Sequence, residues 1–270
     1  MATIESALLD IGGFDILAAQ DTAVHRRDPR AKVLTALAFI LTVVSYDKYD
    51  LSGLIPLFVY PVALMAVGNL PPGYLLGKLL FASPFALIIG IFNPLLDRST
   101  VLQVGPVLIS GGWVSYASIL LRFSLTLSAA LILVSTTGFN SVCLALERMK
   151  APKSLTVQFM LLYRYIFVLA SEASRMYKAW TLRSAMHKRM PMRIFVSLVG
   201  QLLLRALERA QRIHMAMLSR GFDGEIHRLR PLQFGKTDLC FVLGWCSFFL
   251  LARGLNLPQM LGEAVIGIMQ

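Results

Sequence analysis

The chain has 270 residues, of which 56% are hydrophobic and only 15% are charged, and its mean hydropathy is +0.66. Soluble domains usually carry about 25% charged residues, so the composition disfavours a soluble enzyme. The net charge of +11 would also suit a nucleic-acid-binding protein, but here the basic residues flank apolar runs instead of covering a soluble face. The first 30 residues lack the basic start and apolar core of a signal peptide, so we expect insertion through internal spans.

Four apolar runs occupy the first half of the chain: Ala31–Tyr46, Leu51–Gly68, Tyr74–Phe92 and Val114–Phe139. A span needs about 20 residues, and although the first run is shorter, Lys32 can extend it by snorkelling. The basic cluster before this run predicts a cytoplasmic N-terminus. Between the third and fourth runs, residues 93–113 are rich in Gly and Pro and carry little net charge, so we expect an outer loop.

Two charged residues lie within these runs, Lys78 in the third and Arg122 in the fourth. Intramembrane charges are functional candidates by default. Both lie near the predicted ends, however, so snorkelling is the preferred explanation. Pro84, inside the third run, is tolerated where neighbouring groups satisfy the carbonyl that it frees.

Residues 141–236 hold 17 Lys/Arg against 5 Asp/Glu, a local balance of +12. A segment this basic between spans indicates a cytoplasmic region. Its two hydrophobic patches are Leu155–Ala170, broken by Arg164, and Ile194–Leu204, which is too short to span. If only the first patch crossed the membrane, the arginine motifs described below would lie on opposite sides. We therefore interpret both patches as interfacial or protein-buried parts of cytoplasmic helices.

The block reads as two long amphipathic helices, Ser171–Arg189 and Met192–Ser219, the second with apolar residues at three-four spacing. Leu239–Ala252 is the last predicted span, with the C-terminus outside. The predicted fold is therefore all-α: a polytopic integral membrane protein with about five transmembrane helices and a cytoplasmic pair of long amphipathic helices. Its parts are a cytoplasmic segment (1–30), spans one to four (31–139), the basic domain (140–236) and the last span with the C-terminus (237–270).

Two short motifs place an arginine beside a small residue: Leu182-Arg183-Ser184 and Ser219-Arg220-Gly221. Gly221 suits a helix end, and Arg220 beside it suits the helix dipole, so a basic cap would explain the second motif taken alone. The pair indicates more. Arginine binds carboxylates bidentately and a small neighbour lets another backbone approach, so two such tips suit grooves on two copies of an acidic-lined protein.

With these motifs the chain resembles the transmembrane T component of energy-coupling factor (ECF) transporters. The arginine pair is similar to the family's two Ala-Arg-Gly-type motifs, and His25–Lys32 is similar to the family's entry to its first span. The resemblance covers roughly Val24–Ala252 and is greatest to the cobalt-transport CbiQ branch. The chain departs at Leu182, where the family usually has Ala, and carries Ser184 and Ser219 where Gly and Ala are common.

The resemblance implies a non-catalytic coupling subunit of an ABC importer in the prokaryotic cytoplasmic (inner) membrane. Arg183 and Arg220, with Leu182, Ser184, Ser219 and Gly221 around them, would dock onto two CbiO-like ATPases, which hold ATP and Mg²⁺. A CbiM-like membrane subunit would bind the transported cobalt, and a small CbiN-like subunit is a further expected partner. Nickel or a vitamin is the alternative substrate.

Other chemistry has little support in the residues. The three cysteines form no CxxC pair, the four histidines are scattered, and no GxxxxGK[ST] pattern occurs, so we expect this chain neither to bind the metal nor to hydrolyse ATP. A self-contained secondary transporter or channel stays open as the second hypothesis, although no inverted repeat is visible. A membrane enzyme acting on phosphate-bearing substrates ranks third, because no nucleophile–base constellation is visible.

Overall fold

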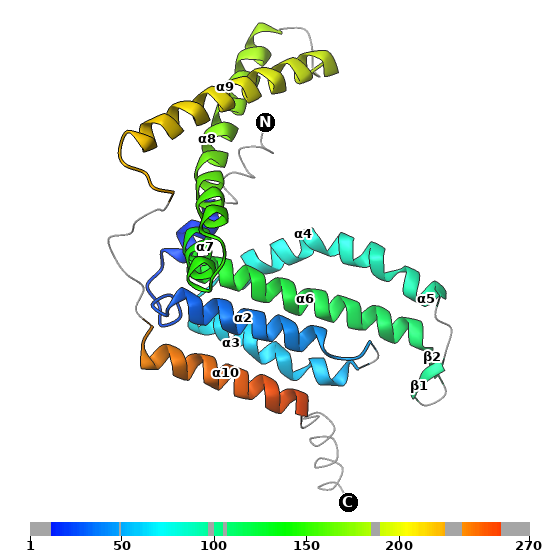
Figure 1. Cartoon of the computed structure of the whole chain (residues 1–270). Helices are drawn as coiled ribbons and strands as arrows, with labels where there is room; N and C mark the ends of the chain where they lie inside the picture. Colours follow the sequence, from blue (N-terminus) through cyan, green and yellow to red (C-terminus); the bar gives the residue numbers. More distant parts are fainter. Residues whose placement is uncertain are drawn as a thin grey trace, which may run out of the picture. The chain divides into compact units, whose positions relative to one another are not determined.

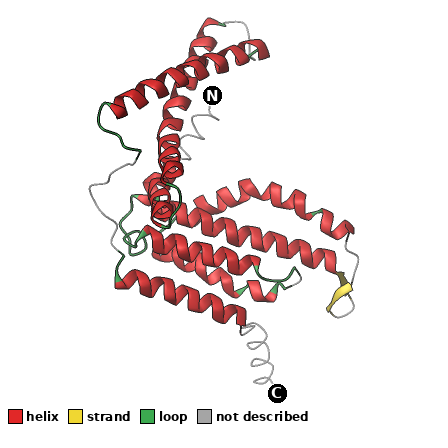
Figure 2. Cartoon of the chain, in the orientation of Figure 1, coloured by secondary structure: helices red, strands yellow, loops and turns green. Residues whose placement is uncertain are grey.

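A computed structural model describes residues 12–48, 50–96, 100–104, 107–184, 190–224 and 234–254. The chain divides into two compact units. We call Leu17–Gly138 with Leu232–Gln270 the bundle unit, and Met1–Ile16 with Phe139–Pro231 the basic unit. Helices dominate both units (Figures 1 and 2).

The bundle unit is built around α6, with α2 packed between α6 and α10, and α4 on α6. A short antiparallel hairpin precedes α6 and pairs Val104 with Val107. The elements of this unit are α2 (Pro29–Val44), the 3₁₀ turns η1 (Ser52–Leu54) and η2 (Pro56–Phe58), α3 (Val59–Val67), α4 (Pro72–Gly90), α5 (Phe92–Leu96), β1 (Thr100–Val104), β2 (Val107–Ser110), α6 (Gly111–Thr137) and α10 (Lys236–Gly254).

Local chemistry explains where α2 begins. The side chain of Asp28 accepts a hydrogen bond from the Arg30 backbone N–H at 2.8 Å, which satisfies one of the donors that a helix start leaves unpaired. Pro29 follows at the first helical position, where its fixed φ suits a helix and its missing N–H costs nothing.

An aromatic cluster forms the centre of the bundle unit. The rings of Phe39 and Tyr60 stack with centroids 4.5 Å apart, and Tyr60 meets Trp245 edge-on at 4.9 Å. Phe249 closes the cluster from α10, 5.4 Å from Phe39. Offset and edge-to-face pairs of this kind contribute about 0.5–1.5 kcal/mol each beyond their buried area. The cluster therefore fixes α2, α3 and α10 against one another.

The outer surface of the bundle unit is apolar where a soluble protein would be polar. On α4, Phe81 is 87% exposed and Phe85 70% exposed. Pro84 lies inside this helix, as predicted, and the Ser83 hydroxyl donates at 2.8 Å to the carbonyl of Leu80, which the proline cannot bond. An apolar exterior and internally satisfied backbone groups are the properties of a helix in lipid.

Four helices are long and apolar enough to cross a membrane: Pro72–Pro94, Gly111–Thr137, Lys153–Arg183 and Lys236–Gly254. Three of them match predicted spans. The first predicted run is the shorter helix α2, which we interpret as a span because it packs between α6 and α10. The described residues therefore form a polytopic membrane protein, and the predicted outer position of the C-terminus concerns residues 255–270, outside the described part.

Several predicted elements differ from the structure. Leu51–Gly68 is not one helix, because Pro56 lacks the N–H that a continuous helix needs, and two 3₁₀ turns precede α3. The predicted outer loop contains α5 and the hairpin, and α6 starts at Gly111, three residues earlier than predicted. Arg122 is consequently the twelfth residue of α6 and not near its end; its guanidinium donates to the backbone carbonyl of Asp47.

The basic unit contains α7 (Phe139–Arg148), α8 (Lys153–Arg183) and α9 (Met192–Leu218). The patch Leu155–Ala170 and the helix predicted from Ser171 were expected as separate elements. This is wrong, because both belong to the continuous helix α8. Arg164 does not interrupt the helix, since arginine is a good helix former. In the first half of α8, Tyr163 stacks on Phe139 at 4.7 Å and donates its hydroxyl to Asp15 at 2.8 Å.

Candidate functional site

The first arginine motif lies at the C-terminal end of α8. Arg183 is the last residue of that helix and is exposed, and Leu182 beside it is 85% exposed. The backbone N–H of Ser184 bonds to the Trp180 carbonyl at 2.9 Å and closes the final turn. Arg183 therefore presents its guanidinium from a rigid helix end, where a cation also favours the helix dipole.

The second motif ends α9 in a Schellman turn. The N–H of Gly221 bonds to the Leu218 carbonyl and the N–H of Phe222 bonds to the Met217 carbonyl, both at 3.0 Å. Gly221 has φ = +79°, which side chains with a Cβ avoid. Arg220 lies within the turn, directly before Gly221, and is exposed. The predicted helix-ending role of Gly221 is confirmed, and the turn fixes the direction of the chain at Arg220.

The structure does not bring the two motifs together. Arg183 lies beside a groove that Arg193, near the start of α9, also lines. Arg220 follows the other end of α9, which has 27 residues and is therefore about 40 Å long. The two arginines are separated by much of that length, which suits two separate docking points better than one site.

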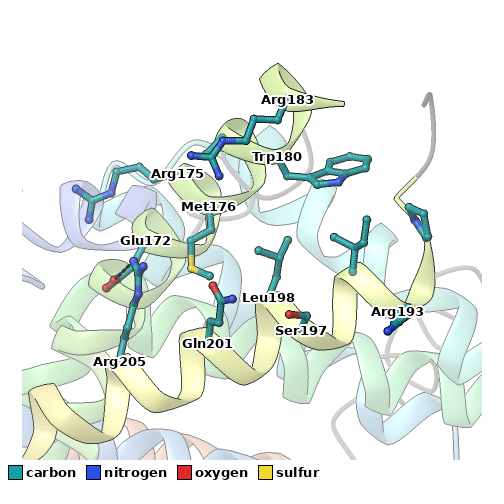
Figure 3. Close-up of a pocket in the computed structure, with 13 residues that line it drawn as sticks. Glu172, Arg175, Met176, Trp180, Arg183, Arg193, Ser197, Leu198, Gln201 and Arg205 are labelled. Atoms are coloured by element: carbon teal, nitrogen blue, oxygen red, sulfur yellow. Dashed lines mark hydrogen bonds and ion pairs between the residues drawn. The ribbon is translucent and has the colours of Figure 1, made fainter. Parts of the chain in front are cut away.

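A groove of about 1110 Å³ lies between the C-terminal half of α8 and the N-terminal half of α9 (Figure 3). Four arginines line it, Arg175 and Arg183 from α8 and Arg193 and Arg205 from α9, against the single acid Glu172. Among the described residues, Arg175, Arg183 and Arg193 have no ion-pair partner. The groove wall is thus strongly basic, and it suits an acidic protein surface.

A second polar cluster lies at the ends of the bundle helices, and the sequence reading missed it. The backbone N–H of Asp28 bonds to Asp238 at 3.2 Å, although the two residues are 210 positions apart. The other carboxylate oxygen of Asp238 accepts from the N–H of Gly235 at 3.0 Å, and Arg27 lies 4.0 Å away. An acid three residues after a helix cap is a recognisable capping signal, so the sequence could have indicated that Asp238 caps its own helix. It could not have indicated that Asp238 also binds the backbone of Asp28.

Lys32 joins this cluster to α6. Its ammonium donates to the carbonyls of Thr136 at 2.8 Å and His25 at 3.2 Å, and the side chain is buried. The prediction that Lys32 snorkels to water is therefore wrong, because its ammonium is held by the Thr136 carbonyl near the end of α6. Partial burial lowers the pKa of His25 below its usual 6.5, and the charge of Lys32 acts in the same direction. The cluster ties the ends of α2, α6 and α10 together.

The described residues contain no group of three or more His, Cys, Asp or Glu side chains that could hold a metal ion. The three cysteines are free: Cys143 is buried, Cys246 half-buried and Cys240 exposed. Two of the four histidines, His187 and His227, lie outside the described residues.

Comparison with known proteins places the chain in a family. Residues 20–231 match the cobalt transport protein family CbiQ. The chain belongs to the CbiQ family. This confirms the family predicted from the arginine motifs and the entry to the first span.

Individual relatives of this CbiQ-family chain agree. It is 28% identical over 125 residues to an uncharacterized protein of Methanocaldococcus jannaschii, covering 46% of this chain and 47% of the relative. It is 30% identical over 133 residues to the cobalt transport protein CbiQ of Rhodobacter capsulatus, covering 48% and 54%. It is 27% identical over 220 residues to the energy-coupling factor transporter transmembrane protein EcfT of Bacillus subtilis, covering 74% and 81%. The chain thus spans about half the length of the first two.

Proposed function

We propose that this chain is the transmembrane coupling subunit of an ECF-type ABC importer. In this role it links two cytoplasmic ATPases to a separate membrane subunit that binds the substrate. The observation that supports the proposal most is the placement of Arg183 and Arg220 at the ends of two helices of one basic unit, separated by much of the length of α9. A pair of ATPases offers two equivalent grooves, so two separated tips match it.

The basic groove supports an acidic partner. Arg175, Arg183 and Arg193 lack ion-pair partners among the described residues, and unpaired arginines beside an exposed helix end favour carboxylates on another protein. Arg183 and Arg220 would each insert into one ATPase, with Leu182, Ser184, Ser219 and Gly221 forming the contact around them. ATP and Mg²⁺ belong to those partners, because this chain carries no phosphate-binding loop.

Transport would follow from a change in the arrangement of α8 and α9. When the ATPases close on ATP, the grooves that hold the two arginines approach each other. Arg183 is the last residue of α8 and Arg220 lies in the Schellman turn that closes α9, so a displacement of either arginine would be transmitted to its helix, as in other hinge and shear motions. The movement would reorient the partner that binds the substrate toward the cytoplasm.

Cobalt is the proposed substrate, since a relative is named a cobalt transport protein and the family carries the same description. The metal would be bound by a CbiM-like membrane subunit, with a CbiN-like accessory subunit, because the described residues of this chain hold no cluster of metal ligands. Nickel or a vitamin is the competing substrate. We further propose the cytoplasmic (inner) membrane of a prokaryote as the location, with a cytoplasmic N-terminus.

The proposal is tested with the double variant Arg183→Glu and Arg220→Glu in the tagged full-length chain, co-expressed with the neighbouring transporter genes. Two lost charge pairs should weaken ATPase binding by at least about a hundredfold, so the ATPases should not copurify. The matched control, Arg148→Glu with Arg212→Glu, makes the same change of charge at exposed positions of the basic unit. Normal ATPase recovery with the motif variant would overturn the docking role.

A further inference from the structure

A single buried carboxylate joins α8 to α9 where the two helices cross. Glu172 is the sole acidic residue of α8, and it is only 8% exposed. Its two oxygens bind two arginines of α9: Oε1 lies 3.3 Å from Arg205 and Oε2 lies 3.1 Å from Arg209. Figure 3 shows Glu172 and Arg205 facing each other at one end of the basic groove.

Packing around this contact is open on both sides. The basic groove of about 1110 Å³ lies on one side of the crossing, toward Met176 and Gln201. An apolar groove of about 410 Å³ lies on the other, toward Leu169 and Ala210. None of the 27 residues of α9 is buried. The ion pairs of Glu172 are therefore a specific contact that joins the two helices between these two grooves.

The geometry also allows rotation at this point. The side chains of Arg205 and Arg209 are 56% and 32% exposed, so their long stems can follow the carboxylate while the helix axes turn. The two arginines are four residues apart on α9, where like charges repel when nothing lies between them. Without the carboxylate, the crossing point would hold two positive charges and no specific attraction.

We propose that Glu172 is the pivot between α8 and α9, a positioning residue that sets their crossing angle and hence the spacing of Arg183 and Arg220. The consequence for transport rests on the proposed coupling function; the control of the crossing angle does not. A rigid pivot converts an approach of the two arginine tips into a scissor movement of the helices. A loose crossing would absorb the same approach by sliding, and the motion would not be transmitted.

The structural part is tested in the full-length chain in lipid nanodiscs. Spin labels on Ala179→Cys and Ala216→Cys, both exposed positions, report the distance between α8 and α9 after the three native cysteines have been replaced. Glu172→Gln keeps the shape of the side chain and removes its charge, so the distance distribution should broaden or shift. Glu208→Gln is the matched control, because Glu208 pairs with Arg212 on the same helix and is exposed. Unchanged distances in Glu172→Gln would overturn the pivot.

A charge exchange separates the pivot from a general loss of folding. Glu172→Arg combined with Arg209→Glu again places one carboxylate between two guanidinium groups, and should restore the narrow distribution. The proposal would be contradicted if the double variant does not restore the narrow distance distribution while the Glu172→Arg single variant keeps the original one.

The functional part uses the complete complex in proteoliposomes. With Glu172→Gln, the ATPases should still copurify and ATP hydrolysis should stay within about twofold, while uptake of radioactive cobalt should fall at least about fivefold, the lower range of typical coupling effects. Uptake at the level of the Glu208→Gln control would overturn the role in coupling. If the unmodified chain recovers no ATPase, the proposed function fails instead, and the distance measurement still decides the pivot.

Discussion

Replacing Gly221 by alanine tests whether the end of α9 is held by its backbone conformation. Gly221 has φ = +79°, and a Cβ added there would meet nothing within 4 Å. The cost of Gly221→Ala is therefore the conformational penalty alone, about 1–2 kcal/mol for an L-residue in the left-handed region. Opening of the Schellman turn would relieve this strain, and Arg220 would then lose the orientation that the turn gives it.

Hydrogen exchange of the two donors of the turn, the amides of Gly221 and Phe222, measures this cost. A penalty of 1–2 kcal/mol should speed exchange at position 221 and at Phe222 about 5–30-fold. Gly200→Ala is the matched control on the same helix. A Cβ at position 200 also has nothing within 4 Å, but its backbone is helical, so alanine should stabilise α9 by about 0.5–1 kcal/mol and slow exchange nearby.

The two alanine variants must therefore act in opposite directions. Equal effects, or unchanged exchange of the Phe222 amide in Gly221→Ala, would show that the positive φ does not hold this end of the helix. Gly221→Ala should also weaken ATPase recovery, although less than the charge reversal, because Arg220 keeps its charge and loses only its fixed orientation.

Two further predictions concern α7 and α8. Lys150 has φ = +74° in a Schellman turn after α7. Lys150→Gly should therefore stabilise the protein by about 1 kcal/mol and raise the thermal midpoint in detergent by about 2–4 °C, whereas Lys150→Ala should not. Equal midpoints for the two variants would show that the backbone at Lys150 is not strained. If α8 belongs to a cytoplasmic domain, a cysteine at the exposed position of Leu182 should react with a membrane-impermeant maleimide only in inside-out vesicles. Labelling in intact cells would show instead that α8 crosses the membrane.

The sequence predicted best the elements that are fixed locally. The Asp28-Pro29 pair marks the start of α2 because both residues act on their own turn. Pro84 was correctly placed inside a helix, and Gly221 at a helix end, since each has a backbone restriction that is visible in one residue. These features depend on a few neighbouring positions, so a short sequence pattern is enough to predict them.

The remaining features depend on partners far along the chain. No periodicity indicates that Asp28 and Asp238 meet, because 210 residues separate them and each could cap its helix alone. Lys32 was expected to reach water, but the end of α6 supplies the Thr136 carbonyl that binds it. Glu172 had no motif to mark it either: its importance comes from lying opposite Arg205 and Arg209. The two arginine motifs are short local patterns that the sequence shows directly, and the family resemblance supported their docking role.

Copurification is the first measurement to make of whether this chain couples ATPases to a substrate-binding subunit. The tagged full-length chain, expressed with its genomic neighbours, would be isolated from gently solubilised membranes and its partners identified with their stoichiometry. We expect two ABC ATPase copies and a small membrane subunit that carries the transported ligand. Isolation of the chain alone, combined with substrate uptake by the chain alone in liposomes, would rule out the coupling role and establish a self-contained transporter.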